Sequence, residues 1–451
     1  MADAVPADRG GFTPGLEEIE DVLLEGDAPV RAGVARAALR HRPFAILWSG
    51  TLASNVGTWM QNVALGALAF RLSHSAGFVA LVGFAQLGPV LALAVVGGVL
   101  ADTYDRRMLI VVTNVWMLVF STVLAWVAHA NHPSETLIVV TVLAVGMGNA
   151  LWGPPQSSLL PTLVDRDEII GAVSLMSVQL NVARVVGPAI GGLILPAVHP
   201  WGIFAINAVT YLFAVAAALA VPKTPATGSG AGAVRSRLLA GFAVARRDPL
   251  VGRALVTITL FSFACLPFLG LMPVIAGINL GMSTRGLAYG VLYACFGAGA
   301  AAGALGVGTV FARADRLAMA RWSLAAFAVA LAAFGALRSA GPAYPVAFLL
   351  GLAYFATTTG VLSALQEHLA DETRGRVMAL WMMGFGGVVP LGLIVFGKVA
   401  DVLARSGHAT AATLTAVLSF GAAAAAVMAA ADVMGSRRPA QRPPLSSPSA
   451  S

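Results

Sequence analysis

The chain carries the segment Gly97-Gly98-Val-Leu-Ala-Asp102-Thr-Tyr-Asp105-Arg106-Arg107, a short charged break between two long apolar runs. The runs cover residues 76–101 and 108–129. About 20 mostly apolar residues suffice for a helix to cross a membrane. The segment is therefore predicted to be the turn between two membrane-spanning helices.

The same alternation of apolar runs and short polar breaks continues along most of the chain. Of all residues, 58% are apolar and only 11% are charged, whereas soluble domains carry about 25% charged residues. The sequence predicts an all-α membrane protein with twelve transmembrane helices. Their expected ranges are 44–70, 76–101, 108–129, 136–158, 169–196, 201–221, 254–278, 285–311, 317–338, 343–368, 377–404 and 410–434.

Most of the 28 lysines and arginines fall in segments on the same side of these helices as the two chain ends. Positively charged loops face the cytoplasm, so both termini are predicted to be cytoplasmic. The net charge of +7 is explained by this topology and requires no nucleic-acid partner. The two cysteines lie in apolar runs and the seven histidines are scattered, so no metal, cofactor or enzyme site is expected.

The chain is expected to form two related halves. A long polar break divides the helices six and six, and Gly308-Thr-Val-Phe-Ala312-Arg-Ala-Asp315-Arg316 is a degraded copy of the first charged turn. Internal repeats with substrate bound between them are typical of transporters. The predicted parts are a disordered cytoplasmic tail (1–40), two pseudo-symmetric six-helix bundles (41–221 and 254–434), a cytoplasmic linker (222–253) and a second disordered tail (435–451).

The charged turn resembles the signature loop between helices 2 and 3 of the major facilitator superfamily. The resemblance implies that Gly98, Asp102, Asp105, Arg106 and Arg107 act in gating, and that Asp102 engages the start of helix 11, near residues 374–378. The alternative is an ordinary charged loop. Helix 5 contains Gly187-Pro188 and Gly191-Gly192, which resemble the antiporter motif of exporting members, although Ala183 replaces its first glycine. The alternative there is a generic packing face.

Arg184 is expected midway along helix 5. A charge at the membrane centre costs roughly 2.5–3.5 kcal/mol, so Arg184 should face a cavity or a partner. Either a substrate group or a structural ion pair would satisfy it. Polar and aromatic residues inside helices form the other substrate-binding candidates, although each could instead bond a neighbouring helix. They are Asn55, Trp59, Gln61, Asn62, Asn149, Trp152, Gln179 and Tyr354.

Proton coupling has no obvious carrier in the sequence. The helix-4 stretch from Thr141 to Gly148 lacks the arginine that proton-coupled drug exporters often carry. Glu367 and Asp401 are the carboxylates nearest the membrane interior and are the coupling candidates. Lys398 and Asp401, one helical turn apart, are expected to form a local pair.

Further details narrow the resemblance to the branch of bacterial enterobactin exporters and related natural-product effluxers. They are Trp48-Ser-Gly50, Gly57-Thr-Trp59-Met-Gln61, Pro154-Pro155, Leu160-Pro161-Thr-Leu-Val164 and Arg374-Gly-Arg376-Val-Met. The resemblance implies a monomer in the lipid bilayer of the bacterial inner membrane. It would export a siderophore, natural product or drug by alternating access and proton antiport. Uptake by the same fold is the main alternative.

Overall fold

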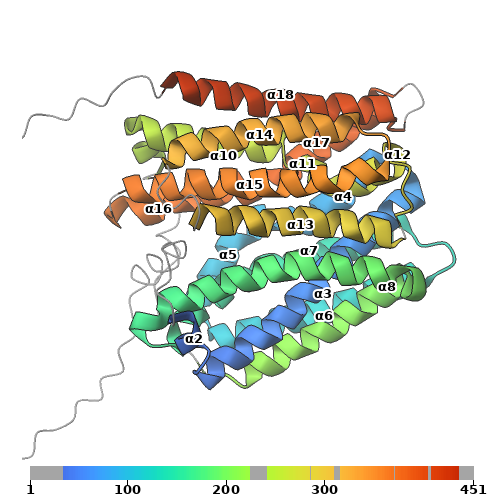
Figure 1. Ribbon diagram of the computed structural model, residues 1–451. Coiled ribbons are helices and arrows are strands. Elements are labelled where there is room, and N and C mark those ends of the chain that lie inside the picture. The colour runs from blue at the N-terminus through green and yellow to red at the C-terminus, as the bar shows by residue number, and fades with distance from the viewer. Residues whose placement is uncertain are drawn as a thin grey trace, which may run out of the picture.

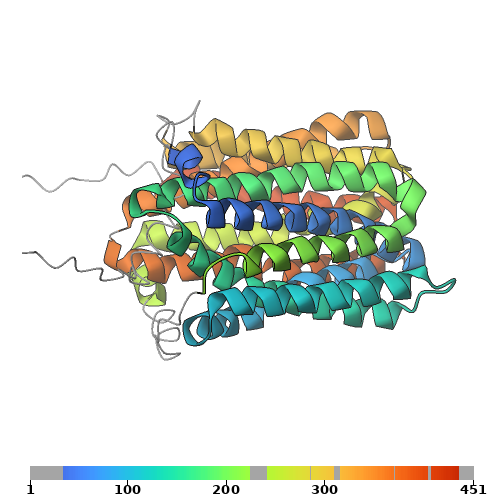
Figure 2. The same ribbon diagram turned by 90° about the horizontal axis from the view of Figure 1, so that it is seen from below.

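The computed structural model of the chain describes residues 34–223, 241–284, 286–308, 315–369, 371–404 and 408–435. Within these residues every regular element is a helix, and the long helices run side by side along one axis (Figure 1 and Figure 2). Ten helices of this described part are long and apolar enough to cross a membrane. The predicted all-α membrane fold is therefore confirmed.

The first half begins with a short helix and a long one. It comprises α2 (Val34–Ala38), α3 (Arg42–Ser73), α4 (Ala76–Leu87), α5 (Pro89–Thr103), α6 (Arg106–His129), α7 (Glu135–Leu159), the 3-10 helices η1 (Leu160–Leu163) and η2 (Arg166–Glu168), and α8 (Ile169–Leu219). α8 consists of two spans, because His199 has φ 58° and ψ 170° and interrupts the helix.

The second half is described from residue 241, and residues 241–247 are helical. It comprises α10 (Pro249–Ala264), α11 (Pro267–Gly270), α12 (Met272–Ile278), α13 (Leu287–Gly308), α14 (Arg316–Ala336), α15 (Ala340–His368), α16 (Asp371–Met382), the π-helix η3 (Met383–Gly387), α17 (Val389–Val402) and α18 (Ala411–Gly435).

The described residues contain ten apolar spans, and the twelve predicted helices are reached only by dividing α8 and adding α3. The ten apolar spans count α8 once, so its division at His199 makes eleven in the described residues. α3 is less apolar and stands outside that set. Its 32 residues nevertheless extend roughly 48 Å, more than the roughly 30 Å of a bilayer core. Eleven apolar spans and α3 are consistent with the twelve helices predicted.

Three predicted helices are interrupted inside their expected ranges. The run 76–101 changes from α4 to α5 at Pro89, which has no N–H to continue the helical hydrogen bonds. The run 254–278 likewise divides at two prolines into α10, α11 and α12. The run 377–404 contains the π-helix η3, a glycine-rich segment between α16 and α17. These breaks lie inside apolar runs, so hydropathy alone does not reveal them.

The structure differs from the predicted disordered tail at its last residues. Ala38 of α2 is fully buried and packs in an apolar cluster with Phe44, Leu47 and Ile169. Burial of this apolar surface favours an ordered helix over a solvated tail. The rest of the predicted N-terminal tail, the C-terminal tail beyond Gly435 and linker residues 224–240 lie outside the described residues.

The helices pack as two bundles, α3 to α8 and α10 to α18 (Figure 1). α3 begins and α18 ends at one face of the molecule, here called the termini face, and the opposite end is the far face. The bundles meet chiefly where α8 contacts α13 and where α4 contacts α17. In Figure 1, α8 and α13 are close near the far face and separate toward the termini face.

Small residues allow the bundles to approach most closely at the far face. A Cβ atom on Gly192 of α8 would overlap Cα of Gly290 on α13, and one on Gly397 of α17 would lie 2.8 Å from the carbonyl oxygen of Ala76. Near the termini face, by contrast, α5 and α16 of the two bundles make few or no contacts among the described residues. The far face is therefore the closed end of the contact between the bundles.

Candidate functional site

Arg184 lies at mid-length in the first span of α8, between the two bundles. Its guanidinium carbon is 5.2 Å from the ring centre of Trp59 on α3 and 4.8 Å from that of Phe355 on α15. Both distances are within the roughly 6 Å over which a cation is attracted to an aromatic face. Because Phe355 belongs to the second bundle, this cation links the bundles at mid-depth.

Among the described residues, no carboxylate neutralises the positive charge of Arg184. In the described parts of the chain no ion pair involves Arg184, and its one hydrogen bond runs from Nη1 to Oδ1 of Asn181 at 3.4 Å. A partly buried cation without an anionic neighbour favours the approach of an anion. The site is thus chemically suited to an acidic group carried on an apolar or aromatic molecule.

Tyr354 belongs to an aromatic wall of the second bundle. It is 8% exposed, and its ring stacks with those of Phe261 and Phe296 at centre distances of 6.1 and 5.9 Å. It lies close enough to Arg184 for the two groups to interact electrostatically. Its neighbour Phe355 was missed by the sequence analysis, although an adjacent pair of aromatic residues was a visible signal.

Gln61 is buried inside the first bundle and not beside Arg184. Its Oε1 accepts a hydrogen bond from Nδ2 of Asn207 at 2.7 Å and one from Oγ of Ser121 at 3.2 Å. Asn207 also donates to the hydroxyl of Tyr211 at 3.2 Å. These bonds connect α3, α6 and α8, which fits the alternative that such amides join helices.

The remaining polar candidates have mixed surroundings. Asn62 accepts a hydrogen bond from Nε2 of Gln86 at 2.5 Å, which joins α3 to α4. Asn149 is half-buried. Asn55, Trp152 and Gln179 each have a buried side-chain atom with no hydrogen-bond partner among the described residues. Because buried polar atoms are normally paired, such atoms mark places where a water or a ligand completes the bonding.

The helix-5 glycines face two different neighbours. A Cβ on Gly187 would lie 2.8 Å from the carbonyl oxygen of Val56 on α3, and Gly191 faces the same helix at Met60. Gly192 faces Gly290 of the other bundle, which also approaches the carbonyl oxygen of Pro188. Gly290 was missed because nothing in the sequence distinguishes it from the other 48 of the 49 glycines.

The charged turn ties helices of the first bundle together at the termini face. Asp105 accepts a hydrogen bond from the backbone N–H of Arg107 and caps α6. Arg106 is 1% exposed, donates to the carbonyl of Ser158 on α7, and interacts electrostatically with Asp102. No hydrogen bond or ion pair joins Asp102 to residues 374–378 among the described residues, in keeping with the separation of the bundles at this face (Figure 1).

The two coupling candidates lie at opposite faces. Glu367 is exposed at the termini face, and its Oε1 accepts a hydrogen bond from Nε of Arg316 at 3.2 Å. Asp401 lies at the far face and accepts hydrogen bonds from the start of α4 and from the segment before α18. The predicted local pair with Lys398 is therefore wrong, because these donors occupy both oxygens of Asp401.

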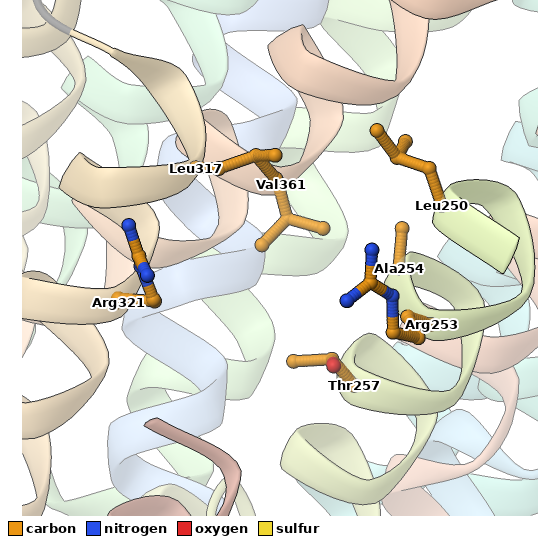
Figure 3. Close-up of a pocket in the computed structure, with 7 residues that line it drawn as sticks. All are labelled: Leu250, Arg253, Ala254, Thr257, Leu317, Arg321 and Val361. Atoms are coloured by element: carbon orange, nitrogen blue, oxygen red, sulfur yellow. The ribbon is translucent and has the colours of Figure 1, made fainter. Parts of the chain in front are cut away.

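A separate small pocket of about 50 Å³ opens near the termini face between α10, α14 and α15. Arg253 and Arg321 stand on its opposite sides (Figure 3). The remaining lining residues are Leu250, Ala254, Thr257, Leu317 and Val361. None of the predicted substrate-binding residues lines this pocket, so it is distinct from the surroundings of Arg184.

The arrangement of the helices matches that of solved transporters. The nucleoside transporter NupG superimposes with a TM-score of 0.68 over 87% of this chain and 98% of its own, at 13% identity. A bacterial homologue of the human lysosomal transporter Spinster gives a TM-score of 0.60 over 87% and 95%, at 14% identity. At sequence identities this low, the structural similarity shows only that the folds are the same.

Similarity in sequence identifies the family to which the chain belongs. The family described as transmembrane secretion effector matches residues 34–448. The enterobactin exporter EntS of Escherichia coli is 28% identical over 353 residues, 76% of this chain and 81% of that protein. The staphyloferrin A transporter of Staphylococcus aureus is 30% identical over 162 residues, 36% of this chain. The chain thus spans only 41% of the staphyloferrin A transporter.

The fold and these relatives define a multi-pass membrane transporter of the major facilitator superfamily. The chain belongs to its transmembrane secretion effector family. The predicted superfamily is therefore confirmed, as is the prediction of a transporter and not an enzyme.

Proposed function

We propose that the protein exports a small organic anion across the bacterial inner membrane, with both chain termini in the cytoplasm. In this orientation the termini face is cytoplasmic and the far face, where the bundles are closed against each other, is the outer face. The excess of lysine and arginine on the side of the termini supports this orientation. The resemblance of Gly187–Gly192 to the antiporter motif supports the outward direction.

Arg184 is the observation on which this proposal depends. It places a cation, without a carboxylate partner in the part of the chain that the structure describes, between Trp59 and Phe355 at the junction of the two bundles. The site is suited to a molecule that combines an acidic group with an aromatic or apolar part. A siderophore, a natural product or a drug of this chemistry fits, and the names of two relatives favour a siderophore.

Transport would proceed by alternating access. In the arrangement described, the bundles touch at Gly192 and Gly290 near the outer face and are separated near Asp102 at the cytoplasmic face. The opposite state would part the outer contact and bring Asp102 to the start of α16. In that state Asp102 would act as the cytoplasmic latch that the family resemblance implies.

Export is proposed to be driven by proton antiport, as the helix-5 motif implies. Glu367 and Asp401 remain the candidate coupling groups, and both lie near the ends of their helices. Proton binding would then act on the contacts that open and close each face. Efflux that continues unchanged when an uncoupler collapses the proton gradient would contradict antiport.

The first test compares metabolites in the medium of wild-type and deletion cells, and then measures binding and efflux of the molecule whose level falls. Arg184→Gln should weaken affinity for this anion roughly ten- to hundredfold, because a charge-assisted hydrogen bond is lost. Arg253→Gln, which removes a cation at the separate pocket, is the matched control and should change affinity little. Accumulation of the molecule inside wild-type cells would indicate uptake and contradict export.

A further inference from the structure

The carboxylate of Asp401 joins the two bundles at the far face. Its Oδ1 accepts hydrogen bonds from the backbone N–H groups of Ala76 at 3.0 Å and Ala409 at 2.9 Å. Its Oδ2 accepts from the hydroxyl of Ser75 at 2.5 Å and from the N–H of Gly77 at 2.8 Å. Residues 75–77 belong to the first bundle, so three of these four bonds cross between bundles.

The donors from the first bundle are the start of a helix. The first N–H groups of a helix have no acceptor within it, and the helix dipole favours negative charge at this end. Ser75 is the N-cap of α4, and its hydroxyl accepts from the N–H of Phe78 while donating to Asp401. Asp401 thus supplies, from the other bundle, an acceptor for N–H groups that α4 cannot pair by itself.

Small residues bring the two helices together beside this carboxylate. A Cβ on Gly77 would lie 2.9 Å from Oδ2 of Asp401. One turn before Asp401, a Cβ on Gly397 would lie 2.8 Å from the carbonyl oxygen of Ala76. Because there is no room for a longer side chain at either glycine, the three hydrogen bonds from residues 75–77 form only when α4 and α17 are in direct contact.

We propose that Asp401 is the latch of the outer gate: its ionised carboxylate holds the far face closed, and a proton from outside releases it. The designation of this gate as outer rests on the orientation given under Proposed function. Each oxygen of the carboxylate already faces two donors. A proton on Oδ1 adds a donor opposite two N–H groups, which cannot accept, so one of those two bonds must break. A proton on Oδ2 requires the Ser75 hydroxyl to reverse from donor to acceptor or its bond to break.

A latch residue such as Asp401 differs from a residue that carries protons across the membrane. The far face closes only when Asp401 is ionised, so a proton bound there in the open state returns to the outside before closure. External acid is therefore expected to prolong the state in which the outer side is open. Of the two coupling candidates, Asp401 would then control the opening of the gate, and Glu367 would remain the candidate for carrying the proton in antiport.

Four basic side chains lie near this contact among the residues that the structure describes. Arg71 and His74 lie at the end of α3, Lys398 lies one turn before Asp401 on α17, and His408 precedes Ala409. Imidazole side chains are in general the ones that change charge near neutral pH, so the effect of these two histidines has to be separated from that of Asp401. A pH experiment therefore has to be repeated with His74→Gln and His408→Gln.

Hydrogen–deuterium exchange of the full chain in lipid nanodiscs, without substrate, tests the latch directly. Asp401→Asn should speed exchange at the N–H groups of Ala76 and Gly77 by roughly ten- to hundredfold, the equivalent of one charge-assisted hydrogen bond. Lys398→Gln, an exposed change one turn away, is the matched control and should leave this exchange within about twofold. Ser75→Ala, which removes one donor, should give an intermediate increase.

The pH dependence supplies a second readout. After correction for intrinsic exchange, acid should raise the exchange of Ala76 and Gly77 in the wild type and in the double histidine variant, but not in Asp401→Asn. Equal exchange in Asp401→Asn and the wild type would overturn the latch, as would equal effects of Asp401→Asn and Lys398→Gln. If Asp401→Asn does not fold, unchanged exchange in Ser75→Ala overturns it. No result of this test depends on substrate or on transport direction, so failure of the latch and failure of export are distinguishable.

Discussion

Replacement of Gly192 by alanine is expected to open the far face. Gly192 on α8 is the closest contact with α13, and a methyl group there would overlap Cα of Gly290 and lie 2.9 Å from its nitrogen. Both neighbouring atoms belong to backbone, so neither can rotate away. The helices can accept the methyl group only by moving apart at this point.

The size of the effect follows from this contact. Non-bonded carbon atoms are most stable about 3.5–4.0 Å apart, so the two backbones must separate by roughly 1 Å. Overpacking of this kind costs about 1–3 kcal/mol. The better helix propensity of alanine applies to the open and the closed state alike. The ratio of closed to open far face should therefore fall by roughly five- to 150-fold.

Distances between spin labels at the far face measure this ratio. Suitable label sites are the exposed Asn131 and Ser339, in the turns before α7 and α15 of the first and second bundle. Cys265 and Cys295 are first replaced by alanine so that no other thiol reacts. Gly192→Ala should increase the population with the longer distance between labels.

Gly153→Ala is the matched control, because this glycine of α7 has no atom within 4 Å of its Cβ position. It should leave the distance distribution unchanged. An unchanged distribution in Gly192→Ala would refute the reasoning, since it would mean that the contact with Gly290 does not limit closure. A change of the same size in both variants would refute it as well.

Three further predictions concern other contacts. Asn207→Ala should lower the free energy of unfolding by about 1–3 kcal/mol, because Gln61 loses a buried donor, and thermal unfolding in detergent measures this. Burial raises the pKa of Asp248, but hydrogen bonds from His368 and two backbone N–H groups outweigh it and hold that pKa below its ordinary value of 3.8. Asp248→Asn should therefore lower Tm above about pH 4, and the difference from wild type should vanish as pH falls through the lowered pKa, where Asp248 is protonated. Asp102→Asn should abolish efflux while membrane insertion, assayed by fractionation, stays normal; normal efflux would contradict a latch at Asp102.

The sequence was sufficient for the membrane class, the ranges of most helices and the superfamily. A run of about 20 apolar residues has few stable alternatives to a spanning helix, since the bilayer offers no partner for unpaired backbone groups. The charged turn at Asp102 and the glycines of helix 5 are local patterns, readable without knowledge of the neighbours. The position of Arg184 halfway along its helix also followed from the sequence, by counting residues from the predicted ends of the helix.

The sequence could not show whether a polar side chain faces the substrate site, a neighbouring helix or the lipid. In a membrane helix the face toward lipid and the face toward other helices are both apolar, so periodicity does not distinguish them. Gln61 and Arg184 therefore looked alike as candidates. The structure buries Gln61 in a network with Asn207 and places Arg184 between aromatic rings of two bundles.

Contacts between the halves were decided by the tertiary structure alone. Asp401 and Ser75 are 326 residues apart in the chain, and Gly192 is distinguished from other glycines only by the backbone it faces. The expected pair of Lys398 and Asp401 was a local inference, and the start of α4 supplied stronger donors. The charged turn can be recognised from its own consecutive residues. A contact between the bundles is formed by two segments far apart in the sequence, which meet only when the chain is folded.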